Sequence, residues 1–377
     1  MTNTTHHAEC TAATLYVAVE LATKEWGLTC SSGPGSARVR VRVAPGDQPA
    51  LVQALEAVKQ RLGVPRAAPV RSCHEAGREG FWPHRLLTRL GVTNLGVDSS
   101  SIEVPRRARR AKTDRVDGEK LLRLLVRYWS GEHDCWHVVQ VPAPAVEDAR
   151  HASRSVTTLQ QERTRYRNRI HSLLALHGVA KLRLDERLPE RLRGARDWAG
   201  EPLGEGLQAR VLETWRVLQA VERERRARGR AERARVKTAT TPTDAIAQQL
   251  TRLAGVAARA ATILADELFT RALRNRRQVG ALTGLVSAPY QSGDTRYDQG
   301  LTRSGLPAIR RLAVQLAWGW LRYQPLSALS QWYRRRFGAS SAGQRRLGIV
   351  ALARRLMIAL WRYVSTGLVP EGARLKA

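Results

Sequence analysis

Four carboxylates in the first third of the chain have the types and spacing of a metal site. Glu20 ends a predicted strand in VAVELATKEW, and Glu75 directly follows another in CHEAGREG. Asp114 and Asp117 lie three residues apart in AKTDRVDGEK, so a helix presents both from one face. Carboxylates at this density repel each other unless a divalent cation lies among them, and hard oxygen ligands favour Mg²⁺, with Mn²⁺ as a substitute. Such metals activate a nucleophile and stabilise a phosphate leaving group.

Each carboxylate also has a simpler interpretation. Glu20 could be a solvated acid at a strand end, and Glu75 a charge at a helix N-terminus. Asp114 could cap the helix, and Asp117 could pair with a nearby cation. A basic run precedes the helix and would hold a phosphate backbone beside the metals: Arg106, Arg107, Arg109, Arg110 and Lys112.

A hydroxyl with nearby cations forms a second candidate site in the C-terminal half. Ser292 lies between Gln291 and Gly293 in a predicted glycine-bearing loop. An exposed hydroxyl, a flexible backbone and cations that stabilise a pentavalent phosphate are what a phosphoryl-transfer nucleophile requires. A Ser-Gly pair is also common in turns, and Tyr290 and Tyr297 are alternative nucleophiles. The cations near Ser292 are Arg296, Arg303, Arg310 and Arg311.

The composition indicates a nucleic-acid partner. The 377 residues include 63 Lys and Arg against 33 Asp and Glu, a formal charge of +30, and residues 301–377 carry 14 basic groups and the single acid Glu371. A surface this positive repels itself unless a polyanion neutralises it. The 43% hydrophobic content excludes a wholly disordered chain. No apolar run approaches the roughly 18 residues of a membrane span, and the dispersed cysteines predict neither a zinc module nor a disulfide scaffold.

Residues 1–146 are predicted to form an α/β domain. Short apolar or alternating segments predict strands, and helical spacing of apolar residues predicts the helices between them. The expected order is strand 15–19, strand 27–30, strand 37–43, helix 49–62, strand 70–73, helix 81–90, strand 91–97 and helix 113–129. This is the element order of a ribonuclease H-like fold. In that fold the first and fourth strands are neighbours and the last helix packs near their ends, so the four carboxylates can converge.

Residues 147–237 are predicted to form a helical arm. Apolar residues step by three and four from Val156 to His177, a heptad pattern over about three repeats. A second helix, over residues 207–237, is apolar early and then strongly charged. The pair predicts a coiled-coil arm for dimerisation, with a helical hairpin inside one chain as the alternative.

Residues 238–377 are predicted to form a mostly α-helical domain. LTRLAGVAARAATILADEL resembles a helix-hairpin-helix, in which Gly255 turns the chain and exposes backbone N–H groups to a phosphate. Apolar helices flanked by arginines follow over 309–323 and 348–364. Aromatic residues among these arginines could stack on bases or fill the core, and core packing is expected for Trp318 and Trp320.

In this order, the motifs resemble the DEDD transposases of bacterial insertion sequences, the insertion-sequence one-ten family, whose members are bridge-RNA-guided serine recombinases. The resemblance rests on VAVELATKEW, EAGREG, KTDRVDGEKL, the two-helix arm, LAGV and GLVSAPYQSG…LTRSGLPAIRRL, and it spans nearly the whole chain. It implies a RuvC-type ribonuclease H-like domain followed by a transposase domain. Glu20, Glu75, Asp114 and Asp117 would bind Mg²⁺, and Ser292 would attack a DNA phosphorus to form a transient phosphoserine link.

The resemblance also implies partners, and this sequence departs from the family pattern at one acid. A non-coding guide RNA encoded by the element would pair with donor and target DNA, and dimers would associate into a tetramer, in the bacterial cytoplasm at the nucleoid. The first acid of the family is usually Asp. Here it is Glu20, whose extra methylene displaces the carboxylate by roughly 1.5 Å.

Two other functions stay open at the level of sequence. One is a Mg²⁺-dependent, Holliday-junction resolvase-like nuclease that uses only the four acids and forms no covalent intermediate. The other is a nucleic-acid-binding protein without catalysis, in which Glu20 marks lost activity.

Overall fold

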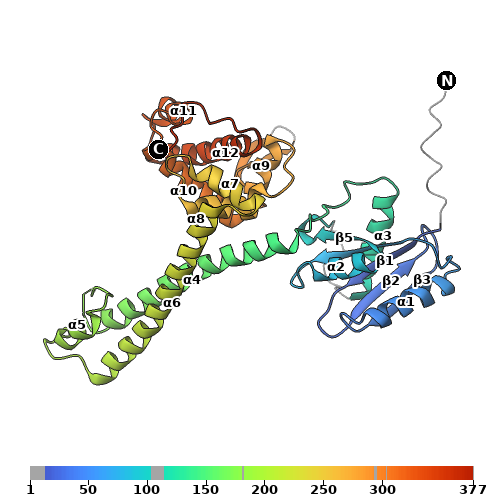
Figure 1. The fold of residues 1–377 in the computed structure, drawn as a ribbon, viewed down its shortest axis with the longest axis horizontal. Helices are drawn as coiled ribbons and strands as arrows, with labels where there is room; N and C mark the ends of the chain where they lie inside the picture. The colour runs from blue at the N-terminus through green and yellow to red at the C-terminus, as the bar shows by residue number, and fades with distance from the viewer. Residues whose placement is uncertain (1–12, 103–113, 181, 293–294, 303, 377) are drawn as a thin grey trace. The chain divides into compact units, whose positions relative to one another are not determined.

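Two compact units divide the chain after Pro142. The computed structural model describes residues 13–102, 114–180, 182–292, 295–302 and 304–376 (Figure 1). The first unit is a mixed α/β sheet domain and the second is mainly helical. The fold classes predicted for the two parts of the chain are therefore confirmed at this level.

A five-stranded sheet organises the first unit. Its strands lie in the order β3-β2-β1-β4-β5, with antiparallel pairs β1–β2 and β2–β3 and parallel pairs β1–β4 and β4–β5. The predicted adjacency of the first and fourth strands is confirmed, and the topology is compatible with a ribonuclease H-like fold. In chain order, the elements are β1 (Leu15–Glu20), β2 (Trp26–Ser31), β3 (Arg38–Val43), α1 (Gln48–Arg61), β4 (Val70–Ala76), α2 (Trp82–Arg89), β5 (Thr93–Asp98), a 3-10 turn (Ser99–Ser101) and α3 (Asp114–Trp129).

Alternation along β1 divides the core of this unit into two layers, because successive side chains of a strand point to opposite faces. Val17 and Val19 belong to an apolar cluster that α1 and α2 cover. Ala18 belongs to a separate cluster with Leu121 and Leu125 of α3. Helices α1 and α2 therefore lie on one face of the sheet and α3 on the other.

A buried polar cluster lies between the sheet and α2. Oδ1 of Asn94 accepts a hydrogen bond from Oγ of Ser72 at 2.7 Å. Nδ2 of Asn94 lies 3.1 Å from Nδ1 of His74 and 2.9 Å from Nδ1 of His84, so the amide can donate to both rings. Burial lowers the pKa of His74 and the pKa of His84 below the ordinary value of 6.5. Both imidazoles are therefore neutral at neutral pH.

We expect the first unit to lose stability as the pH falls through 6.5. The unfolded chain then binds protons on these imidazoles that the folded chain binds only at lower pH, so acid favours unfolding. Hydrogen exchange of the β4 and β5 amides at about pH 7.5 and about pH 5.5 measures this loss. The loss should be smaller in a His74→Gln variant. Equal opening free energies at both pH values would contradict the prediction.

Two long helices form an arm in the second unit and lie side by side (Figure 1). Ile170 and Leu174 of the first helix share an apolar cluster with Val211 and Leu218 of the second. The alternative prediction, a helical hairpin inside one chain, is therefore what the structure shows. A role of the arm in dimerisation stays a prediction. The arm consists of α4 (Pro144–Ala175), α5 (Leu188–Gly194) and α6 (Glu205–Thr238).

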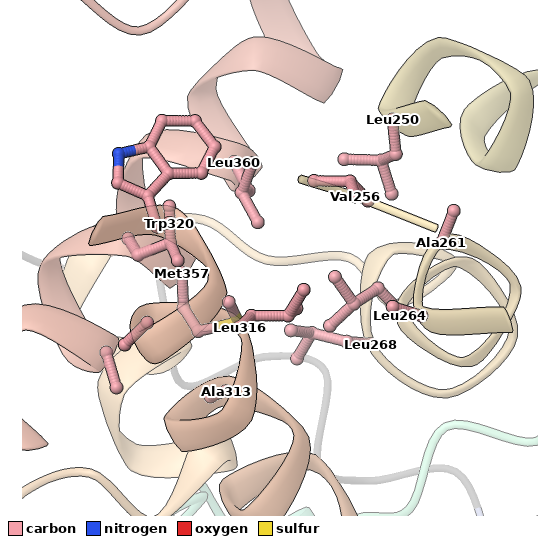
Figure 2. Close-up of a cluster of buried hydrophobic side chains, with 14 of the residues drawn as sticks. Leu250, Val256, Ala261, Leu264, Leu268, Ala313, Leu316, Trp320, Met357 and Leu360 are labelled. Atoms are coloured by element: carbon pink, nitrogen blue, oxygen red, sulfur yellow. The ribbon is translucent and has the colours of Figure 1, made fainter. Parts of the chain in front are cut away.

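The other helices of the second unit surround one hydrophobic core (Figure 2). Trp320 is buried in it, and its Nε1 donates to Oγ of Ser327 at 2.9 Å. Trp318 is 52% exposed, so the predicted core packing is right for Trp320 and wrong for Trp318. Residues two apart lie on different faces of a helix. These helices are α7 (Pro242–Thr251), α8 (Ala258–Leu264), the π-helical turn η3 (Ala265–Phe269), α9 (Arg276–Thr283), α10 (Pro307–Tyr323), α11 (Ala328–Phe337) and α12 (Ala342–Thr366).

Gly255 turns the chain between α7 and α8, as the sequence predicts. Its φ of +88° is in the left-handed region that favours glycine. A Cβ at this position would lie 3.0 Å from Cβ of Tyr323. The contact of this turn with a phosphate stays a prediction. Among the described helices, none is both long and apolar enough to cross a membrane.

Buried ions attach the arm to the helical core. Asp266 of η3 and Asp244 of α7 are almost completely buried. Arg235, in the last turn of α6, meets both: its Nε lies 2.8 Å from Oδ1 of Asp244, and its Nη2 lies 3.1 Å from Oδ1 of Asp266. From α4, Arg154 donates two hydrogen bonds to the carboxylate of Glu267, at 2.7 and 3.0 Å. Both helices of the arm are thus held by charge at the same π-helical turn.

Candidate active site

Two of the predicted acids lie at the ends of neighbouring strands. Glu20 is the last residue of β1, and Glu75 is the residue before the end of β4. The parallel register pairs Val19 with His74, so Glu20 and Glu75 lie at the same level. By alternation they share the face of the sheet that carries α3. Glu75 is exposed and Glu20 is half-buried.

The beginning of α3 lies against Glu20. A Cβ on Gly118 would stand 3.1 Å from Cδ of Glu20 and 2.6 Å from Oγ1 of Thr29. Glu20 therefore lies beside the helical turn that carries Asp117. Oε2 of Glu20 also accepts a hydrogen bond from Nη2 of Arg40 at 2.6 Å. A cation from β3 thus balances the first carboxylate of the predicted site.

The donors at this edge of the sheet fit a hard cation in type. Glu20, Glu75 and Asp117 offer only oxygen, and the buried Oγ1 of Thr29 has no hydrogen-bond partner within the described part of the chain. Within that same part, no three acidic, His or Cys side chains form a group that could hold a metal ion. Asp114 begins α3, but its side chain lies outside the described structure. So do the predicted phosphate-binding residues Arg106, Arg107, Arg109, Arg110 and Lys112.

A Gly118→Ala substitution tests this contact. The added methyl group would press on Thr29 and Glu20, so we expect the free energy of unfolding of the first unit to fall by about 1–3 kcal/mol. Gly206, in the first turn of α6, has open space where a Cβ would lie, so Gly206→Ala is the matched control and should cost nothing. Urea unfolding followed by circular dichroism measures both. Unchanged stability in Gly118→Ala would show that Glu20 and α3 are not in contact.

Ser292 ends a β-strand, where the sequence predicts a loop. β6 (Ser287–Ser292) and β7 (Thr295–Leu301) form an antiparallel hairpin in which Ser292 pairs with Thr295. Nearly all of the hairpin is exposed. Tyr290 and Tyr297 stack across it, with ring centroids 4.8 Å apart. The hydroxyl of Ser292 is therefore presented at the exposed end of a two-stranded ribbon.

Three of the four cations predicted near Ser292 are described. Arg296 is exposed and pairs with Gln291 in the hairpin register. Arg311 is exposed on α10. Arg310 donates from Nη2 to the carbonyl oxygens of Thr302 and Ser304, at 2.8 and 2.7 Å, so it holds the segment that follows β7. The fourth, Arg303, lies outside the described residues.

Two features of these sites were missed by the sequence analysis. Arg40 alternates with valines in RVRVRV, a pattern that predicts a solvent-facing cation, and its partner on β1 is evident only from the strand order. The hairpin did leave a signal. A two-residue Gly-Asp connection between short segments that contain strand-favouring residues is typical of a β-hairpin, and Gly293-Asp294 occupies that place in the sequence between segments that each contain one tyrosine.

Comparison with known proteins identifies the family. The family described as "Transposase IS116/IS110/IS902 family" matches residues 247–331, which include the hairpin and Ser292. The chain is 39% identical over 380 residues to y4rJ of Sinorhizobium fredii (strain NBRC 101917 / NGR234), a protein named as a candidate transposase, covering 96% of this chain and 94% of y4rJ. It is 28% identical over 270 residues to y4qE of the same organism, also named as a candidate transposase, covering 70% of this chain and 61% of y4qE. The chain therefore belongs to the IS110 family of transposases.

Proposed function

We propose that this transposase cleaves and rejoins DNA strands through a phosphoserine intermediate on Ser292. Membership of the family makes DNA transposition its activity. The observation that carries the finer proposal is the position of Ser292, exposed at the end of a hairpin within the segment that matches the family. The attacking oxygen must approach phosphorus in line with the leaving oxygen. An exposed hydroxyl, which no bulky group covers, allows a DNA strand to take up that geometry.

The proposed reaction is a transesterification. Oγ of Ser292 loses its proton and bonds to a DNA phosphorus, while the bond from phosphorus to a sugar oxygen breaks and that oxygen takes a proton. Attack by the sugar hydroxyl of another strand on the phosphoserine reverses the step and joins the new strand. Arg296 and Arg311 place positive charge in the same segment, where it would stabilise the pentavalent phosphate.

For the first unit we propose a ribonuclease H-like metal site. Glu20, Glu75, Asp114 and Asp117 would hold Mg²⁺, or Mn²⁺, which when bound would promote deprotonation of the nucleophile and stabilise the leaving oxygen. Support comes from the common level of Glu20 and Glu75 and from the contact of Glu20 with the start of α3. The ion pair with Arg40 restrains the longer carboxylate that replaces the usual Asp.

We also propose a non-coding guide RNA as a partner, and dimers that associate into a tetramer. The resemblance of the motifs supports both, and the formal charge of +30 favours binding of polyanions such as DNA and RNA. DNA bound in this way would place the protein at the bacterial nucleoid.

The proposal is tested by trapping the intermediate. The full chain is incubated with the RNA that copurifies with it, DNA carrying an end of the element, and Mg²⁺. A denaturing gel should show a protein–DNA adduct, and mass spectrometry after nuclease digestion should locate the phosphate on Ser292. Cleavage without an adduct would favour the nuclease that uses only the acids, and binding without cleavage would favour a non-catalytic binder.

A further inference from the structure

A long groove follows one face of α12 in the second unit. Its volume is about 1250 Å³. Leu347, Val350, Arg354, Ile358 and Arg362 recur along α12 at helical spacing and form its floor. Its walls are α11, the start of α9, the base of the β6–β7 hairpin and the chain after α12. Because 1.5 Å of helix separates successive residues, the floor from Leu347 to Arg362 is roughly 20 Å long.

The charge of the groove is strongly positive. Two acids, Asp298 and Glu371, line it together with six arginines. Within the described residues, none of the six guanidinium groups in the groove forms an ion pair. Arg235 and Arg154, which attach the arm to η3, both do. Six cations against two acids leave a net positive charge that repels itself, so the groove is suited to a polyanion. The six are Arg276, Arg277, Arg336, Arg354, Arg355 and Arg362.

The groove also offers apolar surface between the charges. Leu347 and Leu368 are each 71% exposed on it. The guanidinium of Arg355 lies 4.1 Å from the centroid of the Trp332 ring, a cation–π pair at the wall. A DNA duplex presents mainly phosphates and keeps its bases stacked inside. An unpaired strand presents phosphates and base faces together, and it is this combination that arginines and apolar side chains bind.

The wall of the groove includes the base of the hairpin that carries the proposed nucleophile. Ser287, at the start of β6, and Gly300 and Leu301, at the end of β7, are part of its wall. Ser292 lies five residues along β6 from Ser287. We infer that the groove binds a single-stranded segment of the DNA substrate and leads it onto the hairpin that carries Ser292. This inference rests on the proposed function, because that function makes the ligand DNA.

Binding of labelled oligonucleotides tests the inference without any cleavage step. The variant Arg355→Ala/Arg362→Ala removes two exposed cations of the groove, and Arg345→Ala/Arg346→Ala removes two exposed cations of the same helix outside it. Fluorescence anisotropy is measured with a single DNA strand of about 15 nucleotides, the same strand as RNA, and the DNA duplex, over a range of salt concentrations.

We expect the groove variant to bind single-stranded DNA at least about tenfold more weakly, with a salt slope reduced by about 1.4 for two lost phosphate contacts. The affinity of the control variant for single-stranded DNA should change less than about twofold, and so should the affinity of the groove variant for the duplex. Equal losses in the two variants, or a loss confined to RNA or to duplex DNA, would overturn the inference. Failure of the serine mechanism alone is recognisable, because Ser292→Ala would then retain both cleavage and single-strand binding.

Discussion

Replacing Ser292 with alanine is expected to abolish the protein–DNA adduct and to lower strand exchange by at least about 10³-fold. The reason is that Oγ of Ser292 is the atom that bonds to phosphorus in the proposed reaction, and alanine has no hydroxyl group. Folding should be unaffected, since position 292 is exposed and alanine is compatible with a strand. The adduct is measured on a denaturing gel, and strand exchange by sequencing of the joined products.

The two tyrosines of the hairpin provide the matched controls. Tyr290→Phe and Tyr297→Phe keep the stacked rings across the hairpin but remove the rival hydroxyl groups. Both variants should form the adduct at nearly the normal rate. An adduct in Ser292→Ala, or its loss in either Phe variant, would remove Ser292 from the role of nucleophile. Cleavage that survives Ser292→Ala but is lost in Asp117→Asn would identify the hydrolytic nuclease instead.

An Arg235→Ala substitution is expected to lower the free energy of unfolding of the second unit by about 3–5 kcal/mol. Two carboxylates depend on this one guanidinium, and both are almost completely buried. Removing it leaves uncompensated charge in the root of the arm. Arg228→Ala is the control, because Arg228 pairs with Glu224 on the exposed surface of the same helix and should cost less than about 1 kcal/mol.

The pH dependence separates this mechanism from lost packing. Burial raises the pKa of Asp266 to about 6, although Arg235 opposes the shift. The folded chain thus holds a proton on Asp266 that the unfolded chain releases near pH 4, so this group favours folding in acid, and its contribution is lost as the pH rises through 6. Without Arg235, which favours the ionised carboxylate, the pKa of Asp266 should rise further. The deficit of Arg235→Ala in urea unfolding should therefore be larger at about pH 8 than at about pH 5, and an equal deficit would indicate a packing defect.

The order and type of elements in the first unit could be predicted from sequence because the strands are short apolar or alternating segments and the helices between them have apolar residues at helical spacing. The adjacency of β1 and β4 followed from that order, and it brought Glu20 and Glu75 to one level. The order of elements did not by itself predict whether all four acids lie close enough together to share a metal. That closeness depends on side-chain directions at the start of α3 and on Arg40, which the local pattern assigns to solvent.

In the second unit, the sequence did not decide which helix packs against the apolar face of α4. A heptad pattern in α4 predicts a partner helix but not the chain that supplies it, and here α6 of the same chain packs against Ile170 and Leu174. The prediction for Trp318 was wrong because apolar neighbours in sequence do not determine which face of a helix is covered. Its neighbours in sequence are apolar, but α10 turns it away from the core that holds Trp320. The segment around Ser292 forms a hairpin and not the predicted loop, because a glycine between short segments is compatible with a tight hairpin turn as well as with a loop.

One helix, α6, belongs to two separate cores. Leu218 lies in the core of the arm and Val236 in that of the terminal helices, and the residues between them are mostly charged. Within the described structure, the ion pairs of residues 223–231 in this stretch are all with neighbours on α6, so whole turns can be gained or lost there without disturbing Glu232, Arg235 or either core. We therefore expect natural variants of this protein to differ in reach, with insertions and deletions concentrated in this stretch and in the opposite part of α4.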